Sequence, residues 1–133
     1  MNMTAATLAI DEYRSSGVLG NVDRSDAHGL ISLLFKGAID HLLAAHGNIE
    51  RKQKQEKAIR ISKSIAILDG LRSSLNLVQG GEIAQNLDDL YDYMQRRLVV
   101  ANADDNSSII SEVMDLLREI QEAWNSIPQE ARK

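Results

Sequence analysis

The sequence predicts an all-α fold, an antiparallel up-down four-helix bundle with a short accessory N-terminal helix. The only proline, Pro128, lies near the C-terminus, so no proline interrupts long helices before it. Apolar residues recur at helical spacing in several long segments, and no segment shows the alternation that is typical of strands. Most connections between these segments are short, so neighbouring helices should run antiparallel.

Length and composition predict one domain, residues 1–133, with a single core. Residues 1–20 should form a cap segment and linker, and residues 25–127 the bundle. Hydrophobic residues make up 44% of the chain and aromatic residues only 4%, so the core should be aliphatic. The absence of cysteine excludes disulfides and thiolate metal sites, and it fits a reducing compartment.

Charge and hydropathy limit the classes of partner. The net charge of −4 argues against a dedicated nucleic-acid binder. No apolar run approaches the ~20 residues that span a bilayer, and the N-terminus shows no signal-peptide pattern. We therefore expect a cytoplasmic protein without membrane insertion.

The first predicted helix, residues 4–16, is short and has few apolar members, among them Ile10 and Tyr13. A helix of this length is marginal alone and needs a surface to lie on. Ile10 and Tyr13 should cover an apolar area of the bundle. Two interpretations stay open: a removable lid over a partner site, and a permanently docked cap.

The second helix should begin after Ser25 or Asp26, run to about His46 and end at Gly47. Its apolar residues, Leu43 included, cover most of the circumference, which predicts the most buried helix. A charged linker follows, and the third helix begins somewhere between Asn48 and Lys57. The core stripe of this third helix is Ala58, Ile61, Ile65, Leu68, Leu71, Leu75 and Val78.

The double glycine Gly80-Gly81 should end one helix and start the next, which runs from Gly81 or Glu82 to about Asn102. A turn over residues 103–107 leads to the last helix, which ends before Pro128. The core stripe of the fourth helix is Ile83, Leu87, Leu90, Tyr91, Met94, Leu98 and Ala101. The last helix carries Ile110, Val113, Met114, Leu117, Ile120 and Trp124.

No pattern of catalytic chemistry occurs. The histidines His28, His41 and His46 do not stand in the Glu-x-x-His arrangement of di-metal bundles. The chain also lacks a phosphate-binding glycine loop and a serine elbow. We expect no catalytic residue, cofactor or metal, and therefore no enzyme. His41 should be a hydrogen-bonded core histidine, and His46 should meet the carbonyl end of its helix.

Two helix faces are candidates for partner binding. The side of the third helix opposite its core stripe has small residues where Lys or Glu would favour helicity. That face is Ile59, Ser62, Ala66, Gly70 and Ser73. It contacts either a partner or the N-terminal helix. The fourth helix has a second face, off its stripe, formed by Asn86, Tyr93, Arg97 and Val100. Tyr and Arg are enriched at binding hot spots. Alternatively, Tyr93 packs on a neighbouring helix with its hydroxyl in water.

The chain resembles the FliS family of flagellin-specific export chaperones over about residues 13–124. Three blocks carry the resemblance. They are Ser25-Asp26-Ala27-His28-Gly29-Leu30-Ile31 with Leu34-Phe35-Lys36-Gly37-Ala38-Ile39; Gly80-Gly81-Glu82-Ile83-Ala84 with Asn86-Leu87, Leu90-Tyr91, Tyr93-Met94, Leu98 and Ala101-Asn102; and Glu112-Val113, Leu116-Leu117, Ile120 and Ala123-Trp124. Two positions depart from the family pattern: Asp26-Ala27 replaces its usual proline, and Phe35 stands where tyrosine is common.

The resemblance implies a cytoplasmic chaperone that binds the disordered C-terminal segment of flagellin. It would prevent premature polymerisation and present the subunit to components of the flagellar type III export gate. An amphipathic segment would fold as it wraps the bundle. Without its partner, the chain should be a monomer or weak homodimer.

Two rival functions remain at this stage. A histidine phosphotransfer bundle would need an exposed histidine in mid-helix. A phosphate or RNA binder would use the basic run between Arg51 and Lys63, although this run lacks interleaved aromatic residues and is interrupted by Glu56.

Overall fold

The structure is a computed structural model that describes residues 27–127, apart from the side chains of residues 77–79. Within this range the chain forms four helices and no strand, which confirms the all-α prediction. The helices are α2 (Ala27–Glu50), α3 (Lys54–Ser73), α4 (Leu77–Asp104) and α5 (Ser107–Asn125). The predicted N-terminal helix, with Ile10 and Tyr13, lies outside the described residues, as do the predicted caps Ser25 and Asp26.

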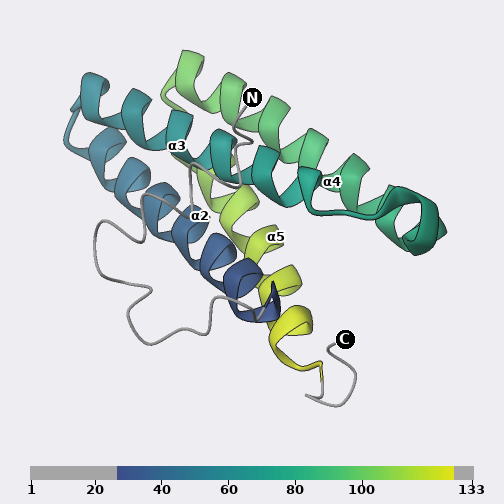
Figure 1. Cartoon of the computed structure of the whole chain (residues 1–133). Helices are drawn as coiled ribbons and strands as arrows, with labels where there is room; N and C mark the ends of the chain where they lie inside the picture. Colours follow the sequence, from purple (N-terminus) through teal and green to yellow (C-terminus); the bar gives the residue numbers. More distant parts are fainter. Residues whose placement is uncertain (1–26, 128–133) are drawn as a thin grey trace, which may run out of the picture.

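The four helices form a closed ring of neighbours. Helix α2 packs against α3 and α5, and α4 packs against the same two helices; the two diagonal pairs do not approach closely. Consecutive helices run in opposite directions (Figure 1). This is the up-down arrangement that short connections favour.

The core is a continuous set of buried side chains from all four helices. It is aliphatic apart from Phe35 and Tyr91, as the composition predicts. Burial raises the pKa of Tyr91 to about 12, because the phenolate would lose its hydration. The largest fully buried side chains include Phe35, Leu34, Leu42, Ile61, Leu68, Leu71, Met94, Leu98, Ile110 and Leu117.

Two predicted helix ends are wrong. Helix α2 does not stop at Gly47 but continues to Glu50. The turn is set later, where Lys52 adopts a left-handed backbone (φ 59°) and the Gln53 N–H donates to the Asn48 carbonyl at 2.8 Å. Helix α3 ends at Ser73 rather than near Val78. The Ser74 hydroxyl and amide both bond carbonyls of the last turn, which satisfies groups that a longer helix would use.

The predicted break at the double glycine is present inside α4. Gly81 has φ 54° and ψ −133°, a conformation that side chains with a Cβ rarely adopt. The residues before it form one helical turn that belongs to α4, and the main helix follows. The sequence therefore located the break, but it assigned the turn before the break to the third helix, whereas α3 has already ended at Ser73.

The connection between α4 and α5 matches the predicted turn. Asp105 has φ 52°, and the Asn106 side chain caps α5 by accepting from the Ser108 and Ile109 amides at 3.0 and 3.2 Å. An Asn at this position satisfies two amides that have no partner within the helix.

The first turns of α4 lie apart from the start of α2 and the end of α5 (Figure 1). Helices α4 and α5 also make the least extensive contact of the four neighbouring pairs. As a result Ile83, which the helical spacing placed on the core stripe, is exposed. The prediction that Ile83 is a core residue is wrong, because the apolar stripe of α4 extends past the part of the helix that its neighbours cover.

Leu98 and its neighbour Val99 provide a matched test of the core. Leu98 is fully buried, whereas Val99 faces outward. Leu98→Ala should lower the free energy of unfolding by about 2–5 kcal/mol, because it leaves a cavity. Val99→Ala should change it by less than about 0.5 kcal/mol. Urea denaturation of both variants measures the difference, and equal effects would contradict the assigned core.

Gly81 and Gly47 should respond oppositely to alanine. Gly81→Ala forces a Cβ onto a positive-φ backbone and should destabilise by about 1–3 kcal/mol. Gly47→Ala lies within α2 and meets only the Arg51 guanidinium, a mobile tip at 3.0 Å, so helix propensity should stabilise by about 0.5–1 kcal/mol. Thermal denaturation measures both changes: the melting temperature should fall in Gly81→Ala and rise in Gly47→Ala. A stabilising Gly81→Ala would argue against the break in α4.

Candidate partner-binding surface

Among the side chains that the structure describes, five large apolar ones are exposed, and they lie on three helices; we call them the exposed apolar set. Their exposed fractions are Ile83 75%, Val99 59%, Leu43 56%, Ile59 51% and Val100 39%. Single exposed apolar residues are ordinary in soluble proteins. Ile83, however, continues a core stripe, and Val99 and Val100 are adjacent in α4. Leu43 shows that the apolar circumference of α2 is not fully covered.

The outer face of α3 is only partly as predicted. Ile59, Ser62 and Ser73 are exposed and Ala66 is half-buried. Gly70 is buried, so its placement on an exposed face is wrong. The reason is that the buried residues of α3 extend beyond the expected stripe to Ile67, and Gly70 lies one turn away from it.

The second face of α4 meets α5 through one carboxylate. The Tyr93 hydroxyl donates to Glu112 Oε2 at 2.9 Å, and Arg97 Nε donates to Glu112 Oε1 at 3.0 Å. We call these three residues the Glu112 cluster. Tyr93 therefore packs toward a neighbouring helix, as one alternative held, but its hydroxyl is bonded to protein. Asn86 and Val100 share this helical face and are exposed.

The cluster shifts the ionisation of its members. The Arg97 guanidinium, and secondly the Tyr93 hydroxyl, hold the pKa of Glu112 below its usual value. The Glu112 carboxylate in turn raises the pKa of Tyr93, because that hydroxyl donates to it. The Arg97, Tyr93 and Glu112 side chains thus form a charged, hydrogen-bonded contact across the least extensively packed pair of helices.

The contact between α3 and α4 is also polar at its edge. Arg72 donates to both carboxylate oxygens of Asp88, at 2.8 and 3.2 Å, and to Gln95 at 3.0 Å. The Arg72 guanidinium lowers the pKa of Asp88. Bidentate geometry fixes the relative position of the two helices better than a single ion pair would.

The histidines take structural positions. His41 is buried, and its Nδ1 accepts a hydrogen bond from Arg60 Nη1 at 3.1 Å, which confirms the predicted core histidine. It is thus not the exposed mid-helix histidine of a phosphotransfer domain. His28 stacks on Trp124 with ring centroids 4.6 Å apart. His46 Nδ1 lies 3.7 Å from Glu50 Oε1. The two side chains are one turn apart because α2 continues past His46 to Glu50.

Within residues 27–127, no group of three or more His, Cys, Asp or Glu could hold a metal ion. No described helix is long and apolar enough to cross a membrane. The basic run after Arg51 is not uniformly available either, because Lys57 is buried and bonded to the Asn102 carbonyl and to Asp105.

Sequence reasoning missed Glu112, Leu43 and Val99 as surface features. Glu112 was part of a block that carries the family resemblance. Its contact with Tyr93, however, depends on how α4 packs against α5, which the sequence does not show. Val99 had an available signal, since it lies off the core stripe of its helix. Leu43 had none, because the apolar residues of α2 cover most of the helix circumference.

The Glu112 carboxyl should titrate below its ordinary range. Its lowered pKa stabilises the folded state above the unfolded-state pKa, and this stabilisation is lost as the pH falls through the folded pKa. Carbon-13 NMR titration should show a pKa below 4.5, moving upward in Tyr93→Phe and further in Arg97→Gln. An unchanged Glu112 pKa in Arg97→Gln would contradict the cluster.

Comparison with known proteins places the chain in a family. A family model described as flagellar protein FliS matches residues 9–131. The flagellar secretion chaperone FliSB of Pseudomonas aeruginosa is 42% identical over 122 residues, covering 92% of this chain and 97% of that protein. The flagellar secretion chaperone FliS of Salmonella typhimurium is 42% identical over 123 residues, 92% of this chain and 91% of that protein. The corresponding Vibrio cholerae protein is 31% identical over 122 residues, 92% and 90% of the two chains. The chain therefore belongs to the FliS family of flagellar proteins.

Proposed function

We propose that this chain is a cytoplasmic, non-enzymatic flagellar export chaperone for flagellin. It binds the disordered C-terminal segment of flagellin, prevents premature polymerisation and delivers the subunit to components of the type III export gate. The relatives described above are named flagellar secretion chaperones, which supports the general role. The identity of the bound segment rests on the resemblance and on the surface of the bundle.

The observation that carries the proposal is the exposure of Ile83. This side chain has the helical spacing of the buried residues Tyr91 and Met94, yet 75% of its surface is in water. A partner helix that lies along the first turns of α4 would complete the apolar contact that the stripe begins. Such an amphipathic segment is the ligand in helix-in-groove recognition.

The distribution of the exposed apolar set favours an extended partner over a compact one. Leu43, Ile59 and the pair Val99-Val100 lie on three different helices. Ordering a disordered chain costs about 1–2 kcal/mol per residue, whereas burying one Leu, Ile or Val side chain contributes about 1.5–3 kcal/mol. Several separated contacts are therefore needed, and a wrapping segment supplies them.

The residues proposed for this interface are the predicted ones with one omission. Gly70 is left out because it is buried. Those within the described residues are Ile59, Ser62, Ala66, Ser73, Asn86, Tyr93, Arg97 and Val100. Ile10 and Tyr13 stay in the proposal as residues outside the described range. Ile83, Val99 and Leu43 are added from the structure.

A direct test is isothermal titration of the full chain with a synthetic flagellin C-terminal segment. We expect saturable one-to-one binding, together with a gain of helical circular dichroism as the segment folds. A scrambled segment of the same composition is the control. Equal binding of the two segments, or none at either, would contradict the proposed function.

Two substitutions locate the interface. Ile83→Ser and Tyr93→Ala should each weaken binding of the flagellin segment about tenfold or more, because they remove apolar contact area. Tyr93→Phe keeps the ring and should bind nearly as the unmodified chain does. Urea denaturation checks that Ile83→Ser is folded. Unchanged affinity in both Ile83→Ser and Tyr93→Ala would show that the interface does not include this part of α4.

A further inference from the structure

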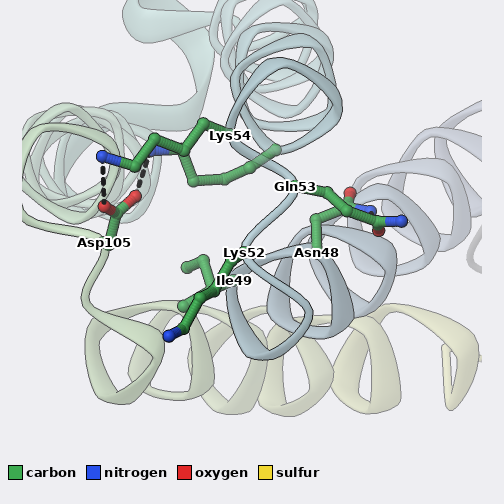
Figure 2. Close-up of a pocket in the computed structure, with 7 residues that line it drawn as sticks. Asn48, Ile49, Lys52, Gln53, Lys54 and Asp105 are labelled. Carbon is green, nitrogen blue, oxygen red and sulfur yellow. Dashed lines mark hydrogen bonds and ion pairs between the residues drawn. The ribbon is translucent and has the colours of Figure 1, made fainter.

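A pocket of about 340 Å³ lies at the end of the bundle where the α2–α3 and α4–α5 connections meet (Figure 2). It is separate from the first turns of α4, at the opposite end of that helix. Its lining residues are Asn48, Ile49, Lys52, Gln53, Lys54, Lys57 and Asp105.

The pocket has more positive than negative charge, with three lysines and one carboxylate. Lys57 is buried and bonded to Asp105 and to the Asn102 carbonyl. Lys54 also approaches Asp105, at 3.8 Å, but its side chain is largely exposed (Figure 2). The Lys52 side chain has no ion pair or hydrogen bond within the described part of the chain, although its backbone amide donates to the Ile49 carbonyl at 3.1 Å. The Asp105 carboxylate thus contacts two of the three ammonium groups, and the Lys52 ammonium group has no carboxylate beside it.

The start of α3 adds to the positive electrostatic potential of the pocket. Gln53 occupies the N-cap position but makes no side-chain cap hydrogen bond. Its amide oxygen instead accepts from Asn48 Nδ2 at 2.8 Å and from Arg51 Nε at 3.0 Å. The N-cap side chain therefore does not cap the first turn of α3, where Glu56 is the one acidic residue, and the positive end of the helix dipole faces an anion favourably.

Asn48 gives independent evidence for a ligand. Only 7% of the residue is exposed, and its Oδ1 atom has no hydrogen-bond partner. A buried acceptor without a donor costs free energy. A ligand that offers an N–H group would remove this cost. An inorganic anion offers none, and it would also leave the apolar Ile49 wall uncovered.

We infer that this pocket binds a peptide segment of another protein that carries a carboxylate next to an apolar side chain. The carboxylate lies beside Lys52 and Lys54, the apolar side chain packs on Ile49, and a main-chain N–H donates to Asn48 Oδ1. The inference does not depend on flagellin binding, because the pocket contains none of the residues proposed for that interface.

The test uses NMR of the nitrogen-15-labelled full chain. The probes are the blocked peptide acetyl-Ala-Glu-Leu-Ala-amide, its Glu-to-Gln analogue and inorganic phosphate. The Glu peptide should cause saturable shifts at the amides of Lys52, Lys54 and Lys57. The Gln analogue should bind about two- to fivefold more weakly, since it lacks one exposed ion pair. Phosphate should bind more weakly than the Glu peptide.

A matched pair of lysine variants gives the control. Lys52→Gln should weaken Glu-peptide binding about two- to fivefold. Lys36→Gln removes the same charge from an exposed position on α2 and should leave binding unchanged. Shifts confined to other residues, equal affinities of the two variants, or phosphate binding as tight as that of the Glu peptide would each overturn the inference.

Discussion

Burial of aliphatic side chains shared by four helices is the interaction on which this structure depends. With so few aromatic residues, cohesion comes from Leu, Ile, Val, Met and Ala at helical spacing, and Leu34, Leu68, Leu98 and Leu117 show the pattern on the four helices in turn. Polar contacts then fix how the helices sit against each other. Arg72 joins α3 to α4, and Glu112 joins α4 to α5. These contacts are partly exposed, so they contribute mainly to geometry rather than to stability.

The same core limits what the bundle can cover. Helix α4 is longer than its neighbours, and its first turns lie apart from α2 and α5 (Figure 1). Its apolar stripe therefore ends in water at Ile83. The bundle also makes its least extensive helix contact between α4 and α5, where Tyr93 and Arg97 share one carboxylate. A partner that contacts this side of α4 can add apolar burial without breaking the core.

Much of the fold was predictable because helical periodicity and glycine chemistry are local. The double-glycine break, the turn before α5 and most core positions followed from spacing alone. The end of α2 did not, because a helical glycine is a stop only when the next residues turn, and Lys52 rather than Gly47 takes the positive φ. The exposure of Ile83 and the burial of Gly70 depend on which neighbour lies opposite. The pairing of Tyr93 with Glu112 and the pocket at Lys52 likewise join segments that the sequence keeps apart.

The central claim is that apolar surface left uncovered by this bundle is covered by a foreign amphipathic segment. The heat-capacity change of binding measures this most directly, because burial of apolar surface makes it negative. Calorimetric titration with the flagellin C-terminal segment at several temperatures should give a large negative heat-capacity change, and this change should be smaller in magnitude for Ile83→Ser. A heat-capacity change near zero at measurable affinity would show that polar contacts, and not the exposed apolar set, hold the partner.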